Sequence, residues 1–248
     1  MQVKLFVLIV TIVSLLVLEN KFPFFRFKNP FWVRVRSNLG LGLVNSIASS
    51  IFTLTIAHYP ILNYPHLGVL TSIDSPIIAG ILSFLILDLY MYGWHRSMHK
   101  IPLAWRFHRV HHTDRTMNVS TAYRFHPIEV LSSSIPKLLL VWWLGISPAV
   151  VLIYELVFSI IVALHHSNLA LPVVIDRLLA KIIVTPNYHR IHHSQLVTET
   201  NSNYGSVLSW WDWIFRTRID RPDPLNIQLG VSDESRELKI WQLLKLPI

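Results

Sequence analysis

The sequence predicts an all-α protein: an integral membrane helical bundle of about four to five spans with a histidine-rich helical cap on its cytoplasmic side. Hydrophobic residues make up 52% of the 248 residues and charged residues only 15%, whereas ordinary globular chains carry about 25% charged residues. Apolar runs recur at the length of a membrane helix. In addition, 11 of the 13 histidines fall between residues 95 and 193.

Five apolar segments are candidate spans, because a helix needs about 20 mostly apolar residues to cross the hydrocarbon core. They lie at about residues 3–19, 39–57, 76–94, 129–145 and 148–164. The first has only Lys4 before it and no small-residue cleavage site after it, which indicates a retained span rather than a signal peptide. The last two are short and Lys137 interrupts one of them, so they form either two crossings or a hairpin that dips into the membrane.

The segments between the spans differ in their content of Lys and Arg. Segments 20–37, 95–127 and 165–248 are rich in basic residues, whereas 58–75 has none and contains His58 and His66, which we treat as ordinary loop residues. The positive-inside rule places the basic segments in the cytoplasm, and 58–75 and the N-terminus outside. The net charge of +8 is explained in this way, since its basic residues lie between apolar runs, and no nucleic-acid partner is expected.

Eight of the histidines stand in clusters with helical spacing. Residues three or four apart on a helix share a face, so each cluster turns its imidazoles toward one point. With no cysteine in the chain, thiolate ligands are excluded, and eight imidazoles exceed the needs of one metal. The spacing therefore predicts two metal ions, although imidazole suits Fe, Zn, Cu and Ni alike. The clusters are His95 and His99; His108, His111 and His112; and His189, His192 and His193.

Three further histidines lie close to these clusters in the sequence. His165 and His166 end the last apolar segment, and we favour His166 as the additional ligand. His126 precedes Pro127, so a metal-binding or supporting role and a helix-capping role are both open for it.

Carboxylates within or beside the spans are candidates for holding the imidazoles. Asp88 lies inside the third span, where a charged residue is costly and indicates function. We expect it to accept a hydrogen bond from a ligand imidazole, with an intramembrane contact to Lys137 or to a hydroxyl group as the alternative. Glu129 and Glu155 are weaker candidates for the same role, and Tyr92 is either a further supporting residue or an interface anchor.

With these residues and spacings, the chain resembles the fatty acid hydroxylase/sterol desaturase superfamily of membrane di-iron oxygenases. The resemblance covers about residues 85–220, and the N-terminal 80 residues match only as apolar spans. Its motifs are Asp88-x3-Tyr92-x2-His95-Arg96-x2-His99, His108-x2-His111-His112, Asn118-x-Ser120-Thr121-Ala122-x-Arg124-x-His126-Pro127-x-Glu129, His166-Ser167-Asn168, Thr185-Pro186-x2-His189-Arg190-x-His192-His193, Asn203-Tyr204-Gly205 and Trp211-Asp212-x2-Phe215.

The resemblance implies an O2-dependent hydroxylase or desaturase acting on a lipid from the bilayer, with two iron ions and an external electron-donor protein. The eight clustered histidines and His166 would be ligands, and His126 matches a position of less certain role. It also implies three parts: N-terminal transmembrane helices (1–94), a catalytic domain (85–220, including the hairpin 129–164) and a cytoplasmic tail (221–248). One departure is Phe215-Arg216-Thr217, where similar members have Phe-Gly-Thr, so the local turn is expected to differ.

Two other classes of function compete with the oxygenase. An all-histidine zinc hydrolase of lipids would work without O2 or a reductant, and a metal transporter would place ionisable groups along several spans at mid-membrane. Within the oxygenase class the substrate is open among sterols, fatty acyl chains, carotenoids and ether lipids. The compact length favours a bacterial inner membrane, with the endoplasmic reticulum as the eukaryotic equivalent.

Overall fold

A computed structural model describes residues 2–27, 29–57, 68–221, 226–234 and 236–248, so His58 and His66 lie outside the described residues. Regular structure within these ranges is helical, apart from isolated β-bridges such as Pro23 with Leu169. The α-helices are α1 (Gln2–Lys21), α2 (Phe31–Ala57), α3 (Pro76–Lys100), α4 (Pro102–His112), α5 (Pro127–Leu144), α6 (Pro148–His166), α7 (Val173–Leu179), α8 (Pro186–His192), α9 (Val197–Thr200), α10 (Trp210–Ile214) and α11 (Ile240–Lys245); 3-10 turns are η2 (Val69–Ser72) and η3 (Val119–Tyr123).

Proline starts the four helices that carry the clustered histidines and also starts α5. A proline fits the first helical position, because its missing N–H has no partner there and its φ angle is already helical. Ser or Thr side chains cap three of these helices by accepting a hydrogen bond from a backbone N–H of the first turn. The residue before a proline is pushed out of the helical region, so each of these helices has a defined start. The prolines are Pro76, Pro102, Pro127, Pro148 and Pro186.

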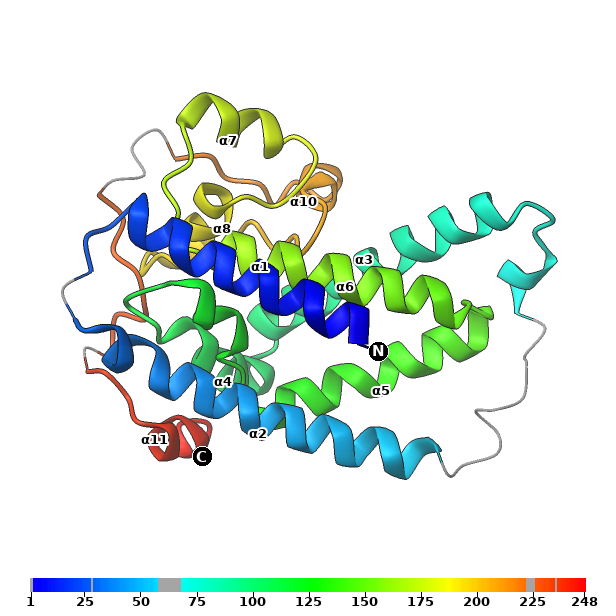
Figure 1. The fold of residues 1–248 in the computed structure, drawn as a ribbon, viewed down its shortest axis with the longest axis horizontal. Coiled ribbons are helices and arrows are strands. Elements are labelled where there is room, and N and C mark those ends of the chain that lie inside the picture. Colours follow the sequence, from blue (N-terminus) through cyan, green and yellow to red (C-terminus); the bar gives the residue numbers. More distant parts are fainter. Residues whose placement is uncertain (1, 28, 58–67, 222–225, 235) are drawn as a thin grey trace.

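The long helices run side by side, and the short ones gather at one end of them (Figure 1). α1 packs on α6, α2 on α5, and α3 on α6. Within the described residues α3, α5 and α6 are long and apolar enough to cross a membrane by length and composition. The hairpin α5–α6 therefore has the length for two crossings. The expected spans 3–19 and 39–57 fall within α1 and α2, whose outward faces expose apolar side chains such as Phe6 and Leu43.

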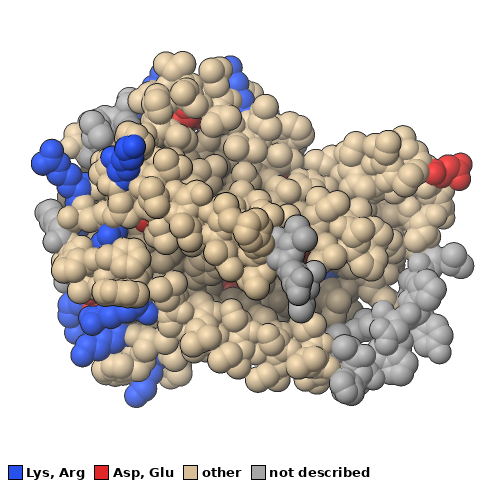
Figure 2. Space-filling view, viewed as in Figure 1, with Lys and Arg blue, Asp and Glu red and all other residues tan. Residues whose placement is uncertain are grey.

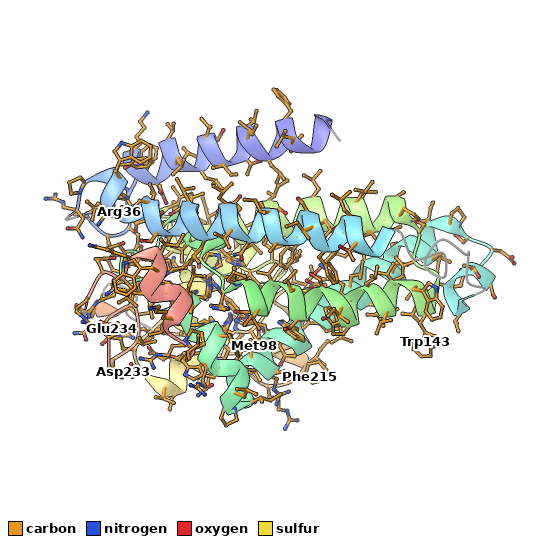
Figure 3. The ribbon with its side chains drawn as sticks, turned by 90° about the horizontal axis from the view of Figure 1, so that it is seen from below. Arg36, Met98, Trp143, Phe215, Asp233 and Glu234 are labelled. Carbon is orange, nitrogen blue, oxygen red and sulfur yellow. The ribbon has the colours of Figure 1, made fainter. Side chains whose placement is uncertain are left out.

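The two ends of the bundle differ in charge. On the face shown in Figure 2, Lys and Arg gather at the end that carries the short helices, and the rest of that face is almost free of them. Figure 3 places Arg36, Asp233 and Glu234 at this end and Trp143 at the opposite end. We call the short helices and loops at the charged end the cap.

The hairpin between α5 and α6 is closed by a glycine turn and an internal ion pair. Gly145 adopts a left-handed conformation (φ 72°), and Gly68 approaches the backbone of Leu144 so closely that a side chain at residue 68 would collide with it. Lys137 pairs with Glu155 at 2.7 Å. The charge of Lys137 is therefore neutralised within the hairpin. The contact between Lys137 and Asp88 that the sequence offered as an alternative does not form.

Candidate metal centre

Nine histidines converge in two neighbouring groups at the cap end of the bundle. In each group the potential ligand nitrogens all lie within 4.8 Å of one another. The rings of His112 and His193, one from each group, stack with centroids 4.5 Å apart, so the groups adjoin. The five-histidine group is His95, His99, His108, His112 and His192; the four-histidine group is His111, His166, His189 and His193.

Four helix ends bring these rings together. The last two turns of α3 supply His95 and His99, and the chain then bends sharply at Ile101 because Pro102 prevents a continuous helix. α4 therefore folds back against α3 and presents the second cluster to the first. The end of α6 and the short α8 supply the remaining ligands.

The spacing of the nitrogens fits a metal ion. Nε2 of His166 lies 3.0 Å from Nε2 of His111 and 3.2 Å from Nε2 of His189. Two imidazole nitrogens bound at about 2.0–2.1 Å to one ion are about 2.9–3.4 Å apart for octahedral to tetrahedral angles. Buried ring nitrogens without a hydrogen-bond partner, such as Nε2 of His95 and of His192, occur in the other group. The donor set present therefore fits two metal ions.

Hydrogen bonds to the outer ring nitrogen orient four of the rings. Nδ1 of His108 lies 2.7 Å from a carboxylate oxygen of Glu129. Backbone carbonyls serve the other three: those of Tyr204 for His95 (2.8 Å), Ser202 for His192 (2.7 Å) and Val162 for His166 (2.8 Å). Such bonds fix the tautomer and leave Nε2 bare to face a metal.

Burial keeps the cap histidines neutral. It lowers the pKa of His111, His112, His189, His192 and His193 well below the ordinary value, and the neighbouring imidazoles lower these pKa values further. Since only an unprotonated imidazole binds a metal, these rings keep their lone pairs available at pH 7.

Asp88 has a different position from the one expected. Its buried carboxylate accepts hydrogen bonds from the backbone N–H groups of Val207 (3.2 Å) and Leu208 (3.0 Å), from Nε1 of Trp211 (2.8 Å) and from the hydroxyl of Tyr154 (3.4 Å). These donors use its two oxygens, and no histidine among the described residues bonds to it. Asp88 thus connects α3 to the loop before α10 by hydrogen bonds. Glu129 is the carboxylate that contacts an imidazole of the two histidine groups.

The structure places three other candidates away from the ligands. His126 caps α5, with Nδ1 accepting from the backbone N–H of Ile128 (3.2 Å) and Nε2 3.3 Å from the carbonyl of Leu244, so it joins neither group. Tyr92 lies with its hydroxyl 2.8 Å from that of Thr217. Glu155 pairs with Lys137, as described above.

The backbone carbonyls of Ser202 and Tyr204 orient two of the histidine rings, and the sequence analysis did not predict them because it considered side chains. Asp212 holds their loop by accepting from the N–H groups of Tyr204 (2.9 Å) and Gly205 (2.7 Å). Asn203, in a left-handed conformation (φ 52°), donates to the carbonyl of Tyr188. The Asn-Tyr-Gly and Trp-Asp motifs were the available signal, and their role is to position carbonyls for the five-histidine group.

A family model described as fatty acid hydroxylase matches residues 80–217, a segment that contains all nine histidines of the two groups. The chain belongs to the fatty acid hydroxylase family.

Individual relatives agree with this assignment. The chain is 32% identical over 152 residues to the ornithine lipid hydroxylase OlsE of Rhizobium tropici, covering 61% of this chain and 45% of that protein. It is 30% identical over 169 residues to the alkylglycerol monooxygenase of Danio rerio (65% and 35%) and 25% identical over 189 residues to a cholesterol 25-hydroxylase-like protein of the same organism (75% and 73%). The chain thus spans less than half the length of the first two relatives. No solved structure matches it significantly.

Arg216 stands where the family resemblance predicts a glycine, and its backbone adopts a conformation typical of glycine. Arg216 has a φ of 55°, in the left-handed region that favours glycine. The turn that follows α10 is closed by the N–H of Thr217 bonding to the carbonyl of Asp212 at 2.9 Å. The turn therefore forms with a residue that strains it.

An apolar cavity of about 250 Å³ adjoins both histidine groups. Its walls come from α3, η3, α5 and α6, and include Trp94, Tyr123 and Phe158 together with rings of both groups. Figure 3 shows side-chain nitrogens gathered near Met98, which precedes His99 in α3. A cavity in this position can hold an apolar chain beside the metal ligands.

A larger and more polar groove of about 530 Å³ reaches the five-histidine group from elsewhere in the cap. It is lined by His99 and Trp105, whose rings lie 4.9 Å apart, and by Arg109 and Asp233, which pair at 2.7 Å. His99 is partly exposed to solvent and lines this groove. The two histidine groups therefore have an apolar approach and a polar one.

Proposed function

We propose that this protein is a membrane-bound oxygenase that holds two iron ions and uses O2 to hydroxylate or desaturate a lipid. The observation that carries the proposal is the meeting of nine imidazole ligands beside an apolar cavity at one end of apolar helices. Bound iron supplies the activation of O2 and the strong oxidant that unactivated C–H bonds require.

The protein's own groups bind the lipid and position the ligand rings. The apolar cavity walls bind part of a lipid chain and exclude water from the reacting carbon. Glu129 and the three backbone carbonyls hold the ligand rings in one orientation. Hydroxylation consumes the lipid, O2, two electrons and two protons and yields the alcohol and one water; desaturation yields an alkene and two waters.

We further propose that the cap faces the cytoplasm, where a donor protein delivers the electrons. The basic character of this end supports that orientation, and the polar groove beside His99 supports an electron supply from the cap. The lipid enters from the bilayer into the apolar cavity. The relatives named for an ornithine lipid and an alkylglycerol support a membrane lipid as the substrate. A bacterial inner membrane is the favoured location.

Lipid profiling tests this proposal. Cells with and without the gene are compared by mass spectrometry, and the purified protein is then assayed on the responding lipid with a reductant, in air and under nitrogen. We expect a gain of one oxygen or a loss of two hydrogens that requires both O2 and the reductant. Lipid cleavage under nitrogen would instead establish the hydrolase, and uptake of metal without any lipid change would establish the transporter.

A further inference from the structure

His165 is a buried histidine that belongs to neither group of ligands. It lies in the last turn of α6, is 2% exposed and lines the apolar cavity. Its ring packs over that of His189 with centroids 4.0 Å apart and the planes tilted by 36°. Because a ring that packs face against a ligand ring does not aim its nitrogens at the same ion, His165 is available for another task.

The ring nitrogens of His165 make no hydrogen bond within the part of the chain that the structure describes. Nδ1 is enclosed and has no partner. Nε2 is then the nitrogen left to face the cavity that the ring lines. A buried polar group without a partner costs free energy, so an imidazole in this apolar wall indicates that a ligand supplies the missing bond.

A neutral imidazole has one N–H donor and one bare nitrogen. Placing the proton on Nε2 directs the N–H into the cavity and leaves the bare nitrogen enclosed. The group that bonds to His165 is then an oxygen acceptor. Such an acceptor lies beside the four-histidine group, because His165 contacts the ring of His189 and its centroid is 4.6 Å from that of His166.

We propose that His165 positions the substrate by donating a hydrogen bond from Nε2 to a substrate oxygen, and thereby selects which C–H bond faces the metals. The inference rests on the proposed function. It narrows the substrate to a lipid whose reacting carbon lies within a few bonds of an ether, ester, carbonyl or hydroxyl oxygen. The middle of a plain hydrocarbon chain offers His165 no partner.

Three variants at this position test the assignment. His165→Gln carries an amide near the position of Nε2, His165→Asn carries one near Nδ1, and His165→Phe keeps a ring without nitrogen. Ser134→Ala is the control, because Ser134 donates to the carbonyl of Val130 in α5 and does not line the cavity. Each purified protein receives the total lipid extract of its host, a reductant and O2. Tandem mass spectrometry locates the new oxygen or double bond, and metal analysis counts the ions per chain.

We expect wild type to react at a carbon near a lipid oxygen. Phe and Asn at residue 165 should lower kcat/KM at least tenfold and spread the reaction over several carbons, with metal content unchanged. Gln should restore most of the selectivity, and Ser134→Ala should behave as wild type.

Reaction of the wild type at mid-chain, or unchanged selectivity in His165→Phe, would overturn the inference while leaving the proposed function intact. Loss of metal from His165→Phe would also overturn it, since the residue would then support the metal site. Absence of any O2-dependent product from the wild type would remove the proposed function and the inference with it.

Discussion

The two histidine groups are built from similar sequence clusters but are supported differently. In the five-histidine group, three rings are oriented by hydrogen bonds from Nδ1, to Glu129 and to the carbonyls of Tyr204 and Ser202. In the four-histidine group only His166 has such a bond. Its other three rings leave Nδ1 buried without a partner and are held by packing; for example, His111 stacks on Phe125 at 4.2 Å.

Repeated histidine spacing in the sequence therefore does not imply that two metal sites are supported equally well. Hydrogen bonds to the outer nitrogen orient a ligand and raise its basicity, and their loss typically costs about 10–100-fold in metal affinity. The five-histidine group is thus arranged before a metal arrives, whereas the four-histidine group depends more on the metal to order it. We therefore expect tighter binding at the five-histidine group.

Removal of a ligand should have the largest effect. His192→Ala and His189→Ala each remove one imidazole from one group, and each should leave about one metal per chain and abolish turnover, a loss beyond the roughly 100-fold expected from a supporting residue. His126→Asn is the control, because asparagine also caps helices and residue 126 lies outside both groups. Metal analysis and O2-dependent lipid turnover are the measurements. Two metals retained in His192→Ala would contradict the assignment of this ligand.

Removal of metal by a chelator should separate the groups. We expect two phases, with the first ion lost from the four-histidine group because fewer hydrogen bonds hold its rings. Timed chelation followed by metal analysis measures the phases in wild type and in His189→Ala, which should lack the fast phase. A single phase in wild type, with both ions leaving together, would refute the difference in affinity.

Loss of Glu129 should weaken the five-histidine group alone. Glu129→Ala removes the acceptor for His108 and should lower the affinity of that group for metal by about 10–100-fold, which brings the two stepwise affinities closer together. Titration against a metal buffer measures both. Asp233→Asn, at a surface carboxylate that pairs with Arg109, should leave both affinities unchanged, and equal weakening of both ions in Glu129→Ala would count against a local role.

The smallest effect concerns the loop that supports the five-histidine group. Arg216→Gly relieves a left-handed non-glycine residue and should stabilise the fold by about 1 kcal/mol. Thermal unfolding in detergent measures this as a higher Tm, with an unchanged metal count. A lower Tm would mean that the Arg216 side chain contributes more than its backbone strain costs.

The sequence predicted which histidines gather better than it predicted the groups that orient them. Helical spacing identified eight histidines because residues three or four apart share a face. The sequence favoured His166 over the adjacent His165, and only His166 joins a histidine group among the described residues. It indicated no role for His165, which points about 100° away around α6 and lines the cavity. Asp88 does not contact the expected imidazole, because three of its donors lie about 120 residues further along the chain; its contact with the hydroxyl of Tyr154 matches the alternative. The supporting carbonyls of Ser202 and Tyr204 carry no side-chain signal, since every residue has one.

The central claim is that two iron ions occupy two adjacent histidine groups in one chain. Metal analysis of protein purified from iron-replete cells, combined with the O2 requirement of its lipid turnover, tests this claim most directly. The account predicts two iron ions per chain in wild type, about one in His192→Ala and in His189→Ala, and turnover by wild type only with O2 and a reductant. One metal ion in fully active wild type, or bound zinc with turnover under nitrogen, would contradict it.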